Sequence, residues 1–96
     1  MLTGKQRAAL RAMANEMETI AQIGKGGLSE NVIAQIDEAL TARELIKVKV
    51  HESAGESARD ICGAVCEAVS AEPVSVVGGR FVLYRRSDKA PKIQLK

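Results

Sequence analysis

Apolar and polar residues alternate along this chain with two different periods. Apolar residues recur every three or four positions in three stretches, which predicts amphipathic helices over about 3–17, 30–43 and 53–70. Shorter apolar or strictly alternating runs predict strands over 20–23, 45–50, 74–77 and 80–85. The predicted order is therefore helix, strand, helix, strand, helix, strand, strand.

Each predicted helix begins at a residue that can cap it. Thr3 with Gln6, and Ser53 with Glu56, have the spacing of a capping box. The Ser29 hydroxyl can accept a hydrogen bond from a free backbone N–H of the following turn. We expect the buried faces of the three helices to be Leu10, Met13, Ala14 and Met17; Val32, Ile33, Ile36, Ala39 and Leu40; and Ala58, Ile61, Cys62, Val65 and Val69.

The strand pattern predicts an α/β fold with a four-stranded mixed sheet. Each strand–helix–strand unit requires a right-handed crossover and parallel strands. The residue before Pro73 disfavours helix, and Gly78-Gly79 has the length of a hairpin turn, so the last two strands should be antiparallel. We expect one domain over 1–86, followed by a basic flexible tail over 87–96.

A glycine turn separates the first strand from the second helix. Gly24, Gly26 and Gly27 surround the single cation Lys25, and glycine lets the backbone approach a partner closely. The N-terminus of a helix carries unpaired N–H groups and a partial positive charge, which suit a phosphate. The alternative is a glycine-rich corner in which Lys25 is simply solvated.

Positive charge gathers at the two ends of the sequence. The chain of 96 residues has a net charge of +2, but residues 1–11 carry +3, residues 79–96 carry +5 and residues 12–78 carry −6. Such segregation favours a polyanionic partner, although two solvated ends would give the same pattern. Lys47 and Lys49 alternate with apolar residues and are interpreted first as solubilising positions. Aromatic residues make up only 2% of the chain, which favours recognition of backbone and shape over base stacking.

No catalytic or metal-binding constellation is visible. Cys62 and Cys66 lie four residues apart on one predicted helix and lack further ligands, so we expect structural thiols in a reducing compartment. His51 has no nucleophile or acid beside it, and the glycine turn matches neither the dinucleotide fingerprint nor a P-loop. Because these catalytic and metal-binding sets are missing, we expect a protein that is not an enzyme and has no cofactor or metal. Because no membrane-spanning run or signal peptide is present, we expect it to be cytoplasmic.

Several blocks of the sequence, in order and over nearly the whole chain, are similar to one known family, the YhbY-like CRM domains. They are Leu2-Thr3-Gly4-Lys5-Gln6-Arg7, Leu10-Arg11, Ile23-Gly24-Lys25-Gly26-Gly27-Leu28, Ala39-Leu40, Arg43-Glu44-Leu45-Ile46-Lys47-Val48-Lys49 and Val82-Leu83-Tyr84-Arg85. The resemblance implies an RNA-binding domain whose fold is similar to the C-terminal domain of the third bacterial translation initiation factor. It also implies an association with precursors of the large ribosomal subunit.

The family's GxxG loop, similar in role to that of KH domains, falls on Gly24-Lys25-Gly26-Gly27. Gly26 makes this loop more flexible than the family pattern requires, so ordering the loop on RNA costs more entropy. The basic segment after Arg86 also lies outside the family pattern. We expect Lys25 to contact phosphate. Lys5, Arg7, Arg11, Arg85 and Arg86 would extend the basic surface if the first helix and the last strand flank the loop.

Two other functions are consistent with the sequence. The acidic middle of the chain could bind a basic protein in a ribosome-associated complex, with or without RNA. A small nucleotide-binding enzyme is the less favoured alternative, because the chain offers no recognisable catalytic set. Tyr84 is the candidate for stacking on a base, but a buried hairpin position is the favoured interpretation.

Overall fold

The order of helices and strands in the computed structural model, which describes residues 2–87 and 93, is the predicted one. The elements are α1 (Gly4–Ala14), β1 (Ala21–Ile23), α2 (Glu30–Arg43), β2 (Leu45–Val50), the short 3-10 helix η1 (Glu52–Ala54), α3 (Ala58–Val69), β3 (Glu72–Val77) and β4 (Arg80–Tyr84). The predicted four-stranded mixed sheet is confirmed.

The strands follow the spatial order β1-β2-β4-β3. β1 and β2 are parallel neighbours, as a strand–helix–strand unit requires. β4 pairs antiparallel with both β2 and β3, so the last strand of the chain is inserted between two strands that precede it. β2 and β3 therefore run parallel without being paired.

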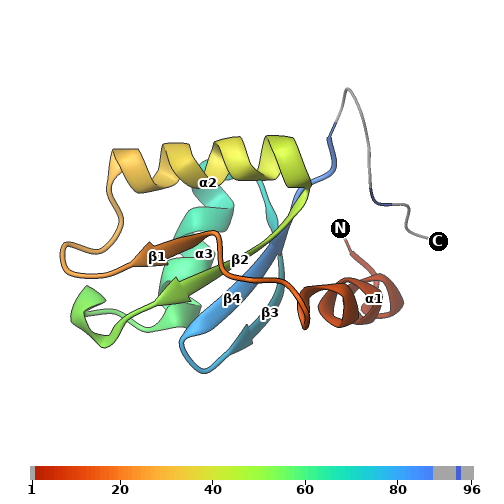
Figure 1. Cartoon of the computed structure of the whole chain (residues 1–96), viewed down its shortest axis with the longest axis horizontal. Coiled ribbons are helices and arrows are strands. Elements are labelled where there is room, and N and C mark those ends of the chain that lie inside the picture. Colours follow the sequence, from red (N-terminus) through yellow and green to blue (C-terminus); the bar gives the residue numbers. More distant parts are fainter. Residues whose placement is uncertain (1, 88–92, 94–96) are drawn as a thin grey trace.

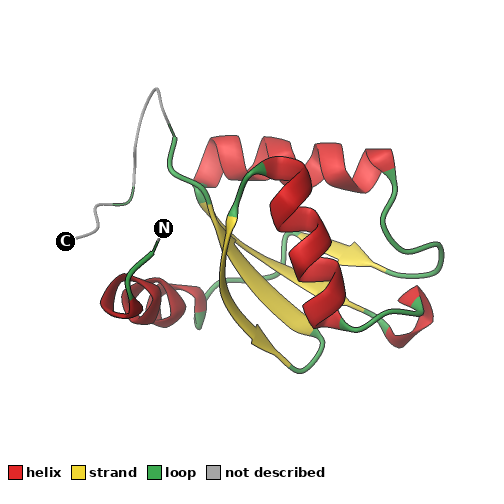
Figure 2. Ribbon diagram, turned by 180° about the vertical axis from the view of Figure 1, so that it is seen from behind, coloured by secondary structure: helices red, strands yellow, loops and turns green. Residues whose placement is uncertain are grey.

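Helices cover the two faces of the sheet unequally. α2 and α3 pack on one face, over a core that includes Ile36, Ile46, Val65 and Phe81 (Figure 2). The other face carries α1 alone, at the end of the sheet away from the β1–α2 loop (Figure 1). A second apolar cluster lies under α1 and consists of Leu10, Ala14, Leu45, Val74, Val82 and Tyr84. Among the described residues, Leu2, Met17 and Ile93 also pack against this cluster, and no helix covers the rest of the face, which we call the open face.

The caps predicted for α1 and α2 are present. Thr3 and Gln6 form a reciprocal capping box, and the Ser29 hydroxyl accepts a hydrogen bond from the backbone N–H of Val32. Two residues of the predicted stripe differ. Met13 is 43% exposed, whereas Leu10 and Ala14 are buried. The helix ends at Ala14, so Met17 lies beyond it and packs, partly buried, against the same cluster.

The predicted start of the third helix at Ser53 is wrong. Glu52–Ala54 forms one 3-10 turn, which ends where Gly55 takes a left-handed conformation with φ +79°. α3 is capped instead by Ser57, whose hydroxyl accepts from the backbone N–H of Asp60. The left-handed Gly55 ends the first turn and redirects the chain, after which the predicted buried stripe of α3 packs on the sheet as expected.

β3 begins two residues before its predicted start and includes Pro73. Proline cannot donate a hydrogen bond within a sheet, but it is tolerated on an edge strand, and β3 is an edge of this sheet. The register between β3 and β4 also shifts between Pro73 and Ser75, which relaxes the pairing at that point.

Glu44, between α2 and β2, is fully buried and has a positive φ of +66°. Its carboxylate accepts hydrogen bonds from the backbone N–H groups of Ser87 at 2.7 Å and Ile93 at 2.9 Å. The predicted flexible tail over 87–96 lies mostly outside the described residues, and its flexibility stays a prediction. Ser87 and Ile93, however, are held against the domain.

Cys62 and Cys66 are free thiols on α3. Within residues 2–87 and 93, no helix is long and apolar enough to cross a bilayer. In the same part of the chain, no group of three or more His, Cys, Asp or Glu side chains could hold a metal ion.

We predict that Gly79→Ala destabilises the fold. An added Cβ would lie 2.9 Å from the carbonyl oxygen of Val50, and the Gly79 carbonyl itself accepts from the Val50 N–H at 2.6 Å. The strands would have to separate, at a cost of about 1–3 kcal/mol. Gly63→Ala is the matched control, because Gly63 lies in exposed helix with open space around it, and it should stabilise by about 0.5–1 kcal/mol. Urea unfolding of both variants measures the difference, and equal midpoints would contradict the close approach.

A second prediction concerns Tyr84, the single tyrosine of a chain without tryptophan. Burial, and then the nearby Glu44 carboxylate, raise the pKa of Tyr84 above its ordinary value of 10.0, against a smaller opposing effect of Arg86. Because the folded state holds this proton more tightly, the contribution to stability is present below about pH 10 and is lost as pH rises through the folded pKa. Ultraviolet titration of tyrosinate should give a midpoint above 10, and Glu44→Gln should move it downward. A midpoint at or below 10 in the folded protein would show that burial and the Glu44 carboxylate do not raise the pKa of Tyr84.

Candidate nucleic-acid interface

The loop between β1 and α2 contains a tight turn formed by glycine. The backbone N–H of Gly27 donates to the carbonyl of Gly24 at 2.9 Å, which closes a turn over Lys25 and Gly26. Gly26 has φ +98° at the third position of the turn, as a type II turn requires. Gly27 is also left-handed, with φ +62°. Glycine is therefore needed for backbone conformation at these two positions, whereas Gly24 has an ordinary φ.

The segment after β2 lies against this turn. A Cβ built on Gly24 would lie 3.5 Å from Ser53 Oγ and 3.9 Å from His51 Cδ2. A Cβ on Gly27 would lie 3.6 Å from the Ala54 carbonyl oxygen and 4.0 Å from Glu56 Oε2. The loop thus lies beside polar groups and at least one carboxylate.

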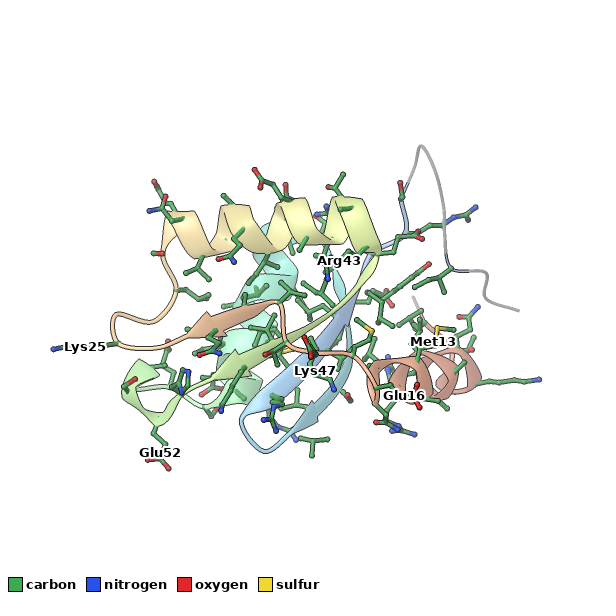
Figure 3. All side chains as sticks on the ribbon, viewed as in Figure 1. Met13, Glu16, Lys25, Arg43, Lys47 and Glu52 are labelled. Atoms are coloured by element: carbon green, nitrogen blue, oxygen red, sulfur yellow. The ribbon has the colours of Figure 1, made fainter. Side chains whose placement is uncertain are left out.

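Lys25 lies at the tip of the loop and is exposed; its side chain points away from the body of the protein (Figure 3). Among the described residues, the amides of Lys25 and Gly26 have no hydrogen-bond partner. The N-terminus of the 14-residue α2 follows within four residues. Free amides, a helix dipole and one cation can together bind a phosphate group.

Of the predicted site residues, Arg85 has its side chain engaged inside the domain. Its guanidinium forms an ion pair with Asp37 at 2.6 Å, and it also donates to the carbonyls of Asp37 and Val69 and to the Thr41 hydroxyl. These contacts tie β4 to the C-terminal parts of α2 and α3. The guanidinium thus connects three elements of the fold.

The remaining predicted cations do not flank the loop. Lys5, Arg7 and Arg11 are on α1, which packs beside Leu45 at the start of β2. The loop lies at the other end of β2, where Ile23 pairs with Val50. At about 3.3 Å per residue the six-residue strand separates them by roughly 17 Å, and Figure 3 shows Lys25 and α1 at opposite ends of the molecule. Arg86 follows β4 and is exposed, and the Arg7 guanidinium donates to the Pro73 carbonyl at 3.3 Å.

Three cations on the open face of the sheet lie between these two ends. Lys47 and Lys49 alternate with buried residues of β2, and Arg80 of β4 lies directly opposite Lys49. Like charges directly opposite in a sheet repel one another, so an anion bound between them would be favourable. The alternation along β2 shows that these lysines share a face. It does not show that Arg80 lies beside them, because that pairing depends on the order of the strands in the sheet.

The same face continues toward the loop through two polar side chains. Gln22 of β1 pairs with Lys49 of β2, and Gln22 Oε1 lies 2.6 Å from Nε2 of His51. His51 in turn borders Gly24. A row of polar and cationic residues therefore runs along β2 from α1 to the glycine turn. Tyr84, the candidate for base stacking, is buried under α1 as the favoured interpretation predicted.

Comparison with known proteins gives relatives of the same length. The chain is 43% identical to "Probable RNA-binding protein YqeI" of Bacillus subtilis over 95 residues, covering 99% of both proteins. It is 39% identical to an "RNA-binding protein" of Haemophilus influenzae, over 98% of this chain and 94% of the relative. The solution structure of the protein SAV1595 from Staphylococcus aureus has the same fold, with a TM-score of 0.80, 42% identity and full coverage of both chains.

The family model described as the CRS1/YhbY (CRM) domain matches residues 2–85. This match begins at the capped start of α1 and ends one residue after β4, so it includes the glycine turn, the open face of the sheet and the Arg85 contacts. Relatives that match over their whole length support the same assignment. The chain therefore belongs to the CRS1/YhbY (CRM) domain family.

Proposed function

We propose that this protein binds RNA through the ribose-phosphate backbone, and that the Gly24–Gly27 turn and the open face of the sheet form the contact surface. The observation that supports this most strongly is the row of cationic and polar side chains along β2, including the like-charged pair Lys49 and Arg80. The names of the relatives from Bacillus subtilis and Haemophilus influenzae describe RNA binding and agree with the proposal.

At the turn, the free backbone N–H groups of Lys25 and Gly26 donate hydrogen bonds to phosphate oxygens, and the Lys25 ammonium adds a charge-assisted contact. Glycine keeps side-chain atoms out of the way of the approaching backbone. The helix dipole of α2 favours negative charge at the same place. Glu56, near Gly27, opposes an anion, which limits the strength of this contact.

Along the sheet, Lys49, Arg80 and Lys47 continue the contact toward α1. Arg11, Arg7 and Lys5 extend it on α1, and Arg86 adds a cation after β4. Arg85 supports this surface indirectly, because its guanidinium is used within the domain. Exposed acidic residues of α2 and α3 lie across the sheet from this surface (Glu30, Glu38, Asp60 and Glu67), so an RNA bound on the open face is kept apart from them.

The RNA we propose is a precursor of the large ribosomal subunit in the cytoplasm, as the resemblance to YhbY-like proteins implies. Contacts through phosphates fix position and carry little sequence information. The protein should therefore recognise the shape and exposed backbone of a folded RNA rather than a base sequence.

We predict that RNA affinity falls steeply with salt. If three or four phosphates are neutralised, a plot of log K against log salt for single-stranded RNA should have a slope of about −2 to −3. Fluorescence anisotropy with a labelled single strand at several salt concentrations measures this slope. A flat plot from low to moderate salt would rule out an electrostatic contact surface.

The double substitution Lys25→Asp with Gly26→Asp should weaken RNA binding by about tenfold or more, because it places two carboxylates where phosphate is expected and strains the turn at Gly26, where φ is +98°. The circular dichroism spectrum should be unchanged, because both residues are exposed outside the regular elements. Unchanged affinity in this variant would move the phosphate contact away from the turn.

Glu56→Gln is the control of opposite sign. It removes a carboxylate near Gly27 without touching the turn, so it should strengthen binding by about two- to threefold at low salt. An effect in the same direction as that of the aspartate substitutions would indicate that both variants merely disturb the fold.

A further inference from the structure

A hollow of about 240 Å³ lies between the C-terminal half of α1 and the open face of the sheet. Its lining comes from α1 and the residue after it, and from all three strands that face α1. The lining residues are Arg11, Ala14, Asn15, Lys47, Ser75, Val77, Arg80 and Val82. The hollow exists because α1 ends at Ala14 and leaves the adjoining part of the sheet uncovered.

The lining combines three cations with an apolar wall and contains no acidic side chain. Arg11, Lys47 and Arg80 come from α1, β2 and β4, so segments far apart in sequence bring their charges to one place. Ala14, Val82 and Val77 provide the apolar surface, and Val77 is 72% exposed. Asn15 and Ser75 add polar groups that can donate and accept hydrogen bonds.

We propose that this hollow binds one unpaired nucleotide of an RNA strand. The base packs against Ala14, Val77 and Val82, and the adjoining phosphate contacts Arg11, Lys47 and Arg80. The inference rests on the proposed function, since it assumes an RNA ligand, and it deepens that function by naming a subsite for a single-stranded nucleotide.

The size of the hollow agrees with a single base. An apolar cavity of roughly 150 Å³ accommodates benzene, so 240 Å³ accommodates one nucleobase with part of its ribose. The arginine side chains can lie over the face of the base, which compensates for the lack of aromatic residues in the lining.

The neighbouring surface indicates where the strand continues. A second hollow of about 390 Å³ shares Lys47 and Arg80 with the first, but it also contains Glu18 with Met17 and Thr19. The carboxylate of Glu18 disfavours phosphate there. The other route follows β2 through Lys49 and Gln22 to His51 and the glycine turn. Because His51 directly follows β2 and stands four residues after Lys47 in extended backbone, this route is about 13 Å long, and one RNA strand can cover it.

The test compares two probes: a short fluorescently labelled oligouridylate, and the same ribose-phosphate chain without bases. We expect the wild-type protein to bind the oligouridylate about three- to tenfold more tightly, because only this probe fills the hollow. The methyl NMR signals of Ala14 and Val82 should shift with the oligouridylate and much less with the abasic chain.

Ser75→Phe fills the hollow without changing the charge, on a strand position that suits an aromatic residue. It should reduce oligouridylate affinity to the level of the abasic chain and leave affinity for the abasic chain unchanged. Ser75→Thr, the matched control, adds one methyl group and should change neither affinity by more than about twofold. Thermal melting checks that both variants fold, and the wild-type methyl shifts test the subsite independently of any variant.

Equal wild-type affinity for the two probes, with undisturbed Ala14 and Val82 methyls, would overturn the nucleotide subsite. If binding then still depends on salt and on Lys25, the proposed backbone contact survives and the subsite alone is wrong. If the protein binds neither probe, the proposed function itself fails. Loss of affinity for both probes in Ser75→Phe, with an unchanged melting temperature, would also overturn the subsite, because the hollow would then be holding backbone alone.

Discussion

The two faces of strand β2 have different environments: one packs beneath α2 and α3, and the other packs partly beneath α1 and otherwise lies on the open face. The position of the other elements follows from this requirement. Strand β2 is paired on both sides, with β1 and β4. Ile46 and Val48 are fully buried beneath α2 and α3, while Leu45 is buried beneath α1 on the other face. A slip of one residue would turn Lys47 and Lys49 into the core. The burial of the apolar residues therefore fixes where the lysines lie on the open face.

The length of α1 sets how much of this face stays uncovered. A longer helix would bury the sheet along the whole length of β2 and would cover the lysines. α1 instead packs at one end and leaves a hollow beside Arg11, Lys47 and Arg80. The exposed acids of α2 and α3 lie on the other side of the sheet. Folding thus places the lysines of β2 and these acids on opposite sides of the sheet, and the proposed RNA contact lies on the side of the lysines.

Two charged groups hold the ends of this arrangement in place: the fully buried Glu44 carboxylate and the partly buried Arg85 guanidinium, whose side chain is 23% exposed. The Arg85 guanidinium connects β4 with α2 and α3, and the Glu44 carboxylate accepts from the backbone of Ser87 and Ile93. Both have hydrogen-bond partners, as a buried charge requires. Arg85 and Glu44 both belong to the sequence blocks that resemble the family, yet their charged groups contact the protein itself. A charged residue in such a block can therefore stabilise the fold rather than contact RNA.

The helices, strands and turns of this protein follow from local signals in its sequence. Periodicity, the caps at Thr3 and Ser29, and the Gly78-Gly79 turn act over a few residues, so they could be recognised without coordinates. The same is true of the glycine turn, since the positive φ at Gly26 and Gly27 is a local requirement. The true cap at Ser57 was missed because Ser53 offered an equally good local signal.

Which residues contact one another depends on the packing of the whole fold. The insertion of β4 between β2 and β3 sets Arg80 opposite Lys49, the packing of α1 creates the hollow, and the ends of α2 and α3 engage Arg85. The separation of α1 from the glycine turn along β2 was decided in the same way. All of these features depend on contacts between segments that are distant in sequence. Local propensity carries no information about such contacts, because strand order and helix placement are set by how the whole apolar surface is buried.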